Sequence, residues 1–284
     1  MTVAVTGASG QLGRLAVEAL LNRDVGPVVA IVRDPDKVRD LAERGAEVRQ
    51  ASYDDPQALD RALRGVDRVL LVSGNEFGKR VEQHGNVVRA AERAGVELLA
   101  YTSIPRAERN PMILAEEHRG TEEVVAESAV PHVILRNSWY WENYLNGVEA
   151  TLESGVLYGA AGDGLVAGAA RADYAEAAAV VLTTDGHAGR TYELGGDERL
   201  SLTDVARVIS TVSGKQVRYR DLPQDELAAG LENAGVPGDF ARVLADSDAG
   251  LRAGWLDVTS GDLRKLIGRP SASAAEVLGR ALAG

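Results

Sequence analysis

A glycine-rich loop between an apolar run and an amphipathic segment constrains the fold of this chain most. From Val3 the sequence reads VAVTGASGQLG, with glycines at positions 7, 10 and 13. Apolar side chains then recur at helical spacing, at Leu12, Leu15, Ala16, Ala19 and Leu20. Glycines at this spacing allow a tight turn and let the backbone approach a pyrophosphate, while the helix N-terminus offers N–H groups to phosphate. We therefore predict a dinucleotide-binding loop; the alternative is a tight turn that binds nothing.

Short, largely apolar runs alternate with helix-length stretches over the first half of the chain. The runs are Val3 to Thr6, Val28 to Val32, Glu47 to Gln50, Arg68 to Val72, Leu98 to Thr102 and His132 to Leu135. Runs without polar alternation are typical of strands buried on both faces. Alternating strands and helices favour parallel pairing with right-handed crossovers. We predict an α/β fold with a Rossmann-type, doubly wound parallel sheet of six strands.

The strand–helix rhythm weakens after residue 136. Glycine-rich turns follow, and then segments that are mostly helical in pattern, together with a strand-like stretch at Thr191-Tyr-Glu-Leu. We expect residues 1–136 to form the nucleotide-binding domain, completed by parts of 165–195. Residues 137–284 are expected to form a smaller, mostly helical lobe on the substrate side.

Composition excludes several classes of protein. The 284 residues include no cysteine, which rules out disulfides, thiolate zinc sites and iron–sulfur clusters, and we expect no metal. The net charge of -11 argues against nucleic acid or an anionic membrane as a partner. The apolar runs are far shorter than the roughly 20 residues that span a bilayer, and the N-terminus has no basic leader. We expect a cytoplasmic protein.

The residue that ends the second apolar run bears on which nucleotide binds. NAD-preferring proteins place an acidic residue there, whereas this chain has Arg33 followed by Asp34. An arginine matches the charge and the fork geometry of a 2′-phosphate, and Lys37 would add charge, while Asp34 could cap the helix after Pro35. This favours NADP(H), with NAD(H) possible. The alternative is that these are solvated loop charges.

The chain lacks the Tyr-x-x-x-Lys pair with which many short-chain reductases protonate a substrate oxygen. None of its four lysines stands four residues after a tyrosine. Reduction of a ketone generates a strongly basic alkoxide, so a positioned acid is valuable there. Reduction of a quinone generates a phenolate with a pKa near ~10, which water protonates. A site without the acid suits a quinone substrate, or no catalysis at all.

An aromatic cluster follows the sixth apolar run, at the strand end where ligands bind in open α/β sheets. Its rings are those of Trp139, Tyr140, Trp141 and Tyr144. Flat rings there could stack a nicotinamide or a planar quinone, and the interleaved Asn137, Glu142 and Asn143 would hold polar edges. The alternative is packing between the lobes.

Several stretches together resemble the NmrA-like branch of atypical short-chain dehydrogenases. They are Thr6-Gly-Ala-Ser-Gly-Gln-Leu-Gly, Ile31-Val-Arg-Asp-Pro, Tyr101-Thr-Ser and Leu135-Arg-Asn-Ser-Trp-Tyr-Trp-Glu-Asn-Tyr. Within that branch the chain is similar, nearly end to end, to bacterial NAD(P)H:quinone reductases. The resemblance implies NADPH-dependent reduction of a small quinone, without flavin.

The resemblance also implies roles for particular residues. The loop of Thr6, Gly7, Ala8, Ser9, Gly10, Gln11 and Leu12 would hold the pyrophosphate, and Arg33 would bind the 2′-phosphate. The backbone of Val72, Ser73 and Gly74 would line the ribose side, and Ser138 to Asn143 would close over the nicotinamide. Related proteins often carry an aspartate for the adenine amino group; this chain departs from that pattern with Ser52, whose hydroxyl can still form a hydrogen bond.

No catalytic residue is assigned from the sequence. His118 lies where some NmrA-like reductases carry a catalytic lysine and could guide a quinone oxygen or shuttle a proton, but we prefer an exposed helix histidine. Tyr140, Trp141 and Asn143 are candidates on the quinone side, and Arg171 could face the cofactor. Asp246 and Asp248 have metal-like spacing but are interpreted as solvated loop charges.

Three functions therefore stay open at this point. The first is flavin-free quinone reduction by direct hydride transfer from the nicotinamide. The second is an NADP(H)-sensing regulator without turnover, as some NmrA-like proteins are. The third is an atypical reductase of another carbonyl or activated double bond. The aromatic segment favours the first over the second, and the missing tyrosine–lysine pair disfavours the third; the sequence does not give the oligomeric state.

Overall fold

The computed structural model describes residues 1–283, which form two compact units. Unit 1 comprises Met1–Ala107, Glu117–Asn137 and Arg171–Tyr192. Unit 2 comprises Glu108–Glu116, Ser138–Ala170 and the chain from Glu193 onward. Each unit is therefore assembled from segments that are distant in the sequence.

The centre of unit 1 is a seven-stranded parallel sheet in the order β10-β6-β5-β4-β1-β2-β3. The strands are β1 (Val3–Val5), β2 (Val28–Val32), β3 (Glu47–Gln50), β4 (Arg68–Leu71), β5 (Leu98–Ser103), β6 (His132–Asn137) and β10 (Thr191–Leu194). This order confirms the predicted Rossmann-type doubly wound sheet. The sheet has one strand more than the six predicted, because β10 pairs beside β6.

Strand position explains which strands are apolar. In β1 all three residues are completely buried, because β2 and β4 flank it with Val3 aligned to Val28 and to Arg68. The third predicted run differs: β3 is the edge strand, and its end residues Glu47 and Gln50 are exposed. The expectation that it is buried on both faces is therefore wrong for β3, since an edge strand leaves one side to solvent.

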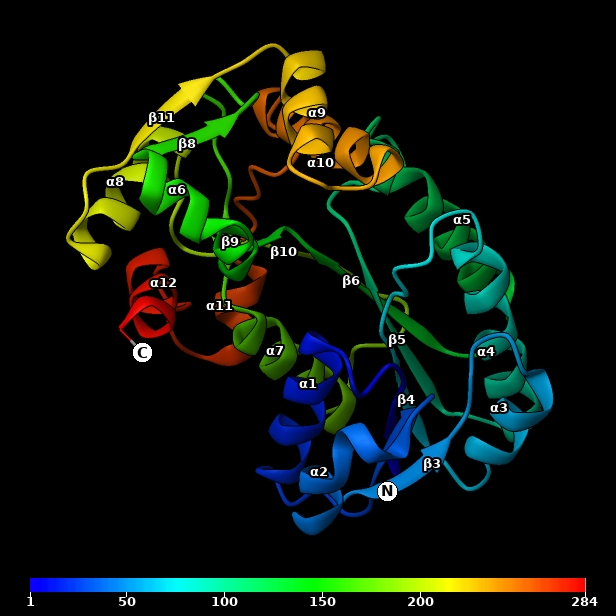
Figure 1. The fold of residues 1–284 in the computed structure, drawn as a ribbon. Coiled ribbons are helices and arrows are strands. Elements are labelled where there is room, and N and C mark those ends of the chain that lie inside the picture. The colour runs from blue at the N-terminus through cyan, green and yellow to red at the C-terminus, as the bar shows by residue number, and fades with distance from the viewer. Residues whose placement is uncertain (284) are drawn as a thin grey trace. The chain divides into compact units, whose positions relative to one another are not determined.

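Helices cover both faces of this sheet (Figure 1). On one face α1 packs against α7, and on the other α3 packs against α4. The helices of this part are α1 (Gln11–Leu21), η1 (Pro35–Val38), α2 (Arg39–Glu43), α3 (Pro56–Ala62), α4 (Arg80–Ala94), α5 (Ile113–Glu127) and α7 (Arg171–Thr183). Gly95 ends α4 in the left-handed conformation, which glycine adopts without strain.

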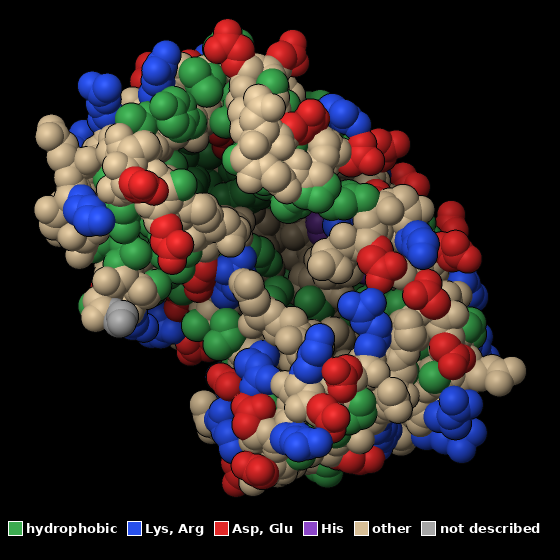
Figure 2. All heavy atoms as spheres, in the orientation of Figure 1, with side chains coloured by type: hydrophobic (Ala, Val, Ile, Leu, Met, Phe, Trp, Pro, Cys, Tyr) green, Lys and Arg blue, Asp and Glu red, His purple; other side chains and the backbone are tan. Residues whose placement is uncertain are grey.

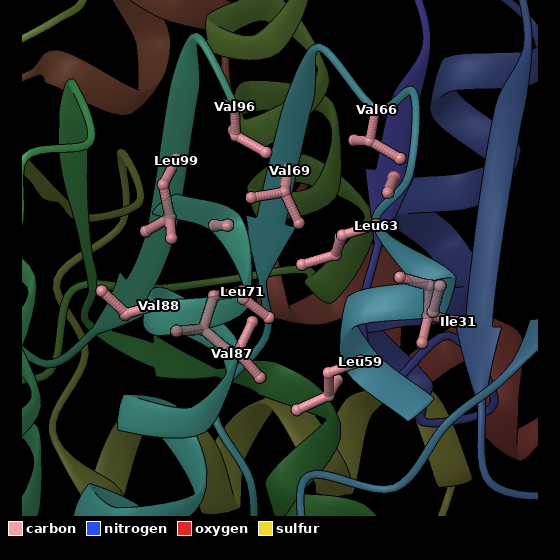
Figure 3. Packing of buried hydrophobic residues seen from close by; sticks show 14 of the residues in the cluster. Ile31, Leu59, Leu63, Val66, Val69, Leu71, Val87, Val88, Val96 and Leu99 are labelled. Carbon is pink, nitrogen blue, oxygen red and sulfur yellow. The ribbon is translucent and has the colours of Figure 1, made fainter. Parts of the chain in front are cut away.

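The core under α3 and α4 is a single apolar cluster. Figure 3 shows Leu59 and Leu63 pointing toward Val87 and Leu71, with Val69 beside them. Contacts between branched aliphatic side chains of this kind supply most of the free energy that holds a helix on a sheet. The cluster fixes β4 and α4, and with them the loop that joins the two.

Unit 2 consists of short elements around small sheets. They are β7 (Trp139–Tyr140), η2 (Trp141–Leu145), α6 (Val148–Ser154), β8 (Val156–Gly159), β9 (Gly168–Ala169), α8 (Leu202–Ser213), β11 (Arg218–Asp221), α9 (Gln224–Asn233), α10 (Gly238–Arg252), α11 (Asp262–Ile267) and α12 (Ala274–Leu282). Strand β8 pairs with β11, and β7 pairs with β9. Capping boxes at Ser201 and Ser273 begin α8 and α12. Within residues 1–283, no helix is long and apolar enough to cross a membrane.

Candidate functional site

The predicted phosphate loop joins β1 to α1 in unit 1. Gly10 precedes the first turn of α1 in an extended conformation, and no side chain caps this helix end. The N–H of Gly10 donates to the carbonyl oxygen of Gly7, 2.9 Å away, which closes the turn. Ser9, Gly10 and Gln11 are exposed. An exposed helix N-terminus without a side-chain cap is suited to receive phosphate oxygens.

Two of the loop glycines are required by geometry. Gly7 has a φ of +61°, a conformation that side chains disfavour. At Gly13 a β-carbon would lie 2.3 Å from the carbonyl oxygen of Gly7 and 3.0 Å from the α-carbon of Ala8. Because both neighbours are backbone, they cannot move aside without shifting the loop. Gly7 thus allows the tight turn and Gly13 allows α1 to pack closely on the loop, which are two of the roles that glycines have in dinucleotide-binding loops.

Thr6 and Tyr53 form hydrogen bonds at the start of the loop. The Tyr53 hydroxyl lies 2.6 Å from Oγ1 of Thr6 and 2.9 Å from the carbonyl oxygen of Val72. Thr6 is completely buried, and its Oγ1 also accepts from the N–H of Val72. Its side chain therefore positions the loop, and a contact of Thr6 with a cofactor stays a prediction. Burial raises the pKa of Tyr53, so the phenol stays protonated.

The segment of Val72, Ser73 and Gly74 follows β4 and is held by buried side chains of unit 1. The N–H of Ser73 donates to Oγ1 of Thr102, 2.9 Å away. The N–H of Gly74 donates to Nε2 of His84, and the carbonyl oxygen of Gly74 accepts from Nε of Arg80. Both hydrogen-bonding groups of the Gly74 backbone are thus fixed by α4.

His84 and Arg80 are buried members of that network. The ring of His84 accepts at Nε2 and lies 3.0 Å from Oγ1 of Thr121 through Nδ1, so the neutral ring carries its proton on Nδ1. Burial, with the charge of Arg80 nearby, lowers the pKa of His84 to about 3. Arg80 is balanced by Glu117, 3.4 Å away. Neither residue is among those predicted from the sequence, although the sequence contains a signal: an arginine and a histidine four residues apart lie on one face of a helix.

Arg33 directly follows β2, and its side chain is 69% exposed. Its Nη1 donates to Oε1 of Glu76, 3.0 Å away, and its carbonyl oxygen accepts from the side chain of Gln50. Asp34 caps η1 by accepting from the N–H of Asp36, which confirms the capping role suggested for it. Lys37 is exposed one turn further on. Arg33 is therefore accessible to a phosphate group, and Asp34 is turned to the backbone.

Ser52 caps its own turn. Its hydroxyl oxygen accepts from the N–H of Asp54, 3.3 Å away, and lies 3.4 Å from Oδ2 of the same residue. This local hydrogen bond is an Asx-like turn, which serines form readily.

The aromatic segment lies at the end of β6 and in unit 2. Trp139 and Tyr140 are half-buried in β7, where they pair with Gly168 and Ala169. Trp141 is completely buried, and a β-carbon on Gly168 would lie 2.8 Å from its ring. Trp141 therefore packs within unit 2, as the packing alternative describes, and its ring faces are covered. Glu142 and Asn143 are half-buried in η2.

The residues on either side of this segment have defined places. Asn137 is the last residue of β6 and is buried. Ser138 is also buried, and its hydroxyl donates to the carbonyl oxygen of Leu256. Arg171 is half-buried at the start of α7, in unit 1. Their contacts with a cofactor stay predictions.

His118 is not the exposed helix histidine that we preferred. It is 8% exposed on α5, and its Nδ1 lies 2.8 Å from the hydroxyl of Tyr101. Burial and the charge of Arg80 lower its pKa, so the ring is neutral at pH 7. A polar run in the sequence surrounds this residue, but tertiary packing against β5 turns it inward.

Asp246 and Asp248, near the end of α10, are not the solvated loop charges that the sequence predicts. Asp248 is half-buried and accepts from the N–H of Ala160 at Oδ2, 2.8 Å away. Asp246 accepts from the N–H of Ile113, 2.7 Å away. Both residues belong to a helix and bind backbone groups of unit 2. Residues 1–283 contain no group of three or more side chains that could hold a metal ion.

Surface charge is mixed around the predicted phosphate loop. Figure 2 shows Lys and Arg side chains interspersed with Asp and Glu side chains over α1 and α2, at the bottom of the view. Arg14 and Asp40 form one such pair, and Arg39 and Asp36 another. An anionic ligand is therefore attracted by local groups, namely the helix end and Arg33, rather than by a broad basic field.

Residues 1–248 match the NmrA-like family, and the chain belongs to that family. Quinone oxidoreductase 2 of Escherichia coli (strain K12) is 48% identical over 275 residues, which cover 96% of each chain. The fold and the family that the sequence motifs indicated are thus confirmed.

Solved structures agree with this placement. The crystal structure of an NADPH-dependent quinone oxidoreductase from Escherichia coli, complexed with NADPH, has a TM-score of 0.94 at 48% identity and covers 98% of this chain and 99% of that one. The triphenylmethane reductase of Citrobacter sp., complexed with NADP(H), has a TM-score of 0.91 at 37% identity and covers 99% of each chain.

Proposed function

We propose that this chain reduces small quinones with NADPH. The observation that carries the proposal is the presence of an uncapped, glycine-rich loop and an exposed Arg33 in a chain that is 48% identical, over 96% of its length, to a quinone oxidoreductase. The residues fit NADPH because Gly13 leaves no room for a side chain and the terminus of α1 has no side-chain cap. Arg33 gives the 2′-phosphate a charged, exposed partner.

Each part of the cofactor is assigned to particular residues in this proposal. Gly7 to Leu12 hold the pyrophosphate through backbone N–H groups and the dipole of α1. Arg33 binds the 2′-phosphate, and Lys37 adds positive charge. Val72 to Gly74 line the ribose side, on a backbone that His84 and Arg80 keep in place.

The contacts that we propose for the nicotinamide and for the quinone come from the segment from Asn137 to Asn143. Tyr140 and Asn143 are half-buried and are proposed to contact the quinone. Trp141 is proposed to act by packing, since its ring is buried against Gly168. Arg171 is proposed as a further contact of the cofactor.

Reduction of a quinone requires little acid catalysis from the protein. When bound, the nicotinamide supplies a hydride, and the protein supplies position and electrostatics. A hydroquinone oxygen has a pKa near ~10, so water is a sufficient proton source. This agrees with the absence of Tyr-x-x-x-Lys from the sequence and with a neutral, buried His118. The absence of flavin, the preference for NADP(H) over NAD(H) and a cytoplasmic location are finer parts of the same proposal.

The test is turnover by the purified protein. NADPH absorbance is followed with benzoquinone, with naphthoquinone and with no acceptor, and without added flavin. We expect NADPH to be consumed only when a quinone is present, and the protein to show no flavin absorbance. Binding of NADPH without consumption would favour the nucleotide-sensing alternative. Consumption with another carbonyl or activated double bond, but with no quinone, would favour the third function.

A further inference from the structure

The side chain that contacts Arg33 is an acid. Glu76 lies in the loop between β4 and α4, and its Oε1 accepts from Nη1 of Arg33, 3.0 Å away. Arg33 and Glu76 are 43 residues apart in the sequence, so only the fold brings them together. Within residues 1–283, this is the one side-chain acceptor of the Arg33 guanidinium, and its other N–H groups face no protein acceptor.

Glu76 is held in place rather than mobile on the surface. Its Oε2 accepts from Nε2 of Gln83, 3.3 Å away, and lies 3.8 Å from Nζ of Lys79. Gln83 is 3% exposed on α4, and the same amide donates to Oδ1 of Asp54. Two residues before Glu76, the backbone of Gly74 is bonded to His84 and Arg80. The carboxylate is thus anchored to α4.

We propose that Glu76 sets the selectivity of this site between NADPH and NADH, by opposing the 2′-phosphate at Arg33. This inference rests on the proposed function, since it assumes that Arg33 binds the 2′-phosphate. Glu76 accepts from one nitrogen of the guanidinium, Nη1, and thereby competes with a phosphate for that group. It also places a negative charge beside a phosphate that carries up to two. NADH has a hydroxyl at that position and experiences no such repulsion.

The consequence is a site that binds both NADPH and NADH, with a smaller preference for NADPH than Arg33 alone would give. Arg33 attracts the phosphate, while Glu76 offsets part of that attraction. The side chains of Arg33 and Glu76 are 69% and 37% exposed, so solvent screens the ion pair and breaking it costs little. The negative charge of the carboxylate is therefore the larger part of the effect.

The experiment compares dissociation constants for NADPH and NADH, measured by calorimetry on the full chain. In E76Q the amide oxygen still accepts from Arg33, but the negative charge is gone. We expect E76Q to bind NADPH about threefold to tenfold more tightly than the wild type at low salt. NADH affinity should change less than about twofold. E76A should show the same direction, because it also removes the charge.

The matched control is D60N, which removes an acidic partner of Arg93 elsewhere in the same unit. It should leave the ratio of the two affinities unchanged. An E76Q variant with unchanged or weaker NADPH binding would overturn the inference, as would an equal gain in D60N or a gain that does not shrink at high salt. If the wild type does not bind NADPH at all, the proposed function itself fails, which is a distinct outcome.

Discussion

The backbone N–H of Gly74 donates to Nε2 of His84, 2.9 Å away, so a buried ring holds the loop that follows β4. The bond requires a lone pair on Nε2 and is lost when the ring is protonated. Burial accordingly lowers the pKa of His84 from 6.5 to about 3. Loop position and protonation state are thus linked through one side chain.

We predict that His84 makes the fold sensitive to acid. Between about pH 6.5 and pH 3 the unfolded chain binds a proton here and the folded chain does not, so stability falls as pH falls. The slope of the free energy of unfolding that comes from this one group is about 1.4 kcal/mol per pH unit.

Urea unfolding of H84Q, whose amide can still accept from Gly74, should show a shallower loss of stability toward low pH. As a control, T102V removes the neighbouring bond to Ser73 without a titratable group. Equal slopes for the wild type and H84Q would contradict the prediction.

The elements that sequence predicted well are those defined by local spacing. The loop from Gly7 to Gly13 follows from the conformations that glycine permits. The buried strands follow from uninterrupted apolar runs. Strand β10 was not placed in the sheet, because Thr191–Leu194 is short, partly exposed and distant in sequence from β6.

The elements that sequence missed depend on contacts between distant segments. His118 stands in a polar run, and only its packing on Tyr101 shows that it is buried. The roles of Tyr53 and Glu76 can be recognised only from the fold, which brings Thr6 beside Tyr53 and Arg33 beside Glu76. A single sequence contains no signal for such pairs.

The close approach at Gly13 predicts that a single methyl group disrupts nucleotide binding. In G13A the β-carbon would lie 2.3 Å from a backbone oxygen of Gly7, so the loop must shift. We expect NADPH affinity to fall at least about tenfold, since a shift of the N–H groups weakens several charge-assisted bonds. Calorimetric titration measures this. The control is G230A in α9, where no atom lies within 4 Å of the added carbon and the helix should gain up to about 1 kcal/mol. Full NADPH affinity in G13A would show that the loop does not contact the pyrophosphate.

The exposed guanidinium of Arg33 predicts a selective loss in R33A. A charge-assisted hydrogen bond contributes about 1.5–3 kcal/mol, so NADPH affinity should fall roughly 10- to 100-fold. NADH affinity should fall less than about threefold, because NADH has no 2′-phosphate. The control is R39A, which removes an exposed arginine paired with Asp36 in the next helix. Equal losses for both nucleotides in R33A would mean that Arg33 does not distinguish them.

Asp248 predicts a pH dependence of opposite sign in unit 2. Burial raises its pKa to about 6, with the charge of Asp221 adding to the effect. Between about pH 4 and pH 6 the folded chain keeps a proton that the unfolded chain has lost, so this contribution to stability is present at low pH and is lost as pH rises through 6.

In D248N the amide oxygen can still accept from Ala160 without ionising. The stability of D248N relative to the wild type should therefore rise by about 1–2 kcal/mol between pH 4 and pH 8. Urea unfolding at both pH values measures the change. S247A, which removes a buried hydroxyl one residue away, should show a difference from the wild type that does not vary with pH. The same constancy in D248N would mean that Asp248 titrates alike in the folded and unfolded chains.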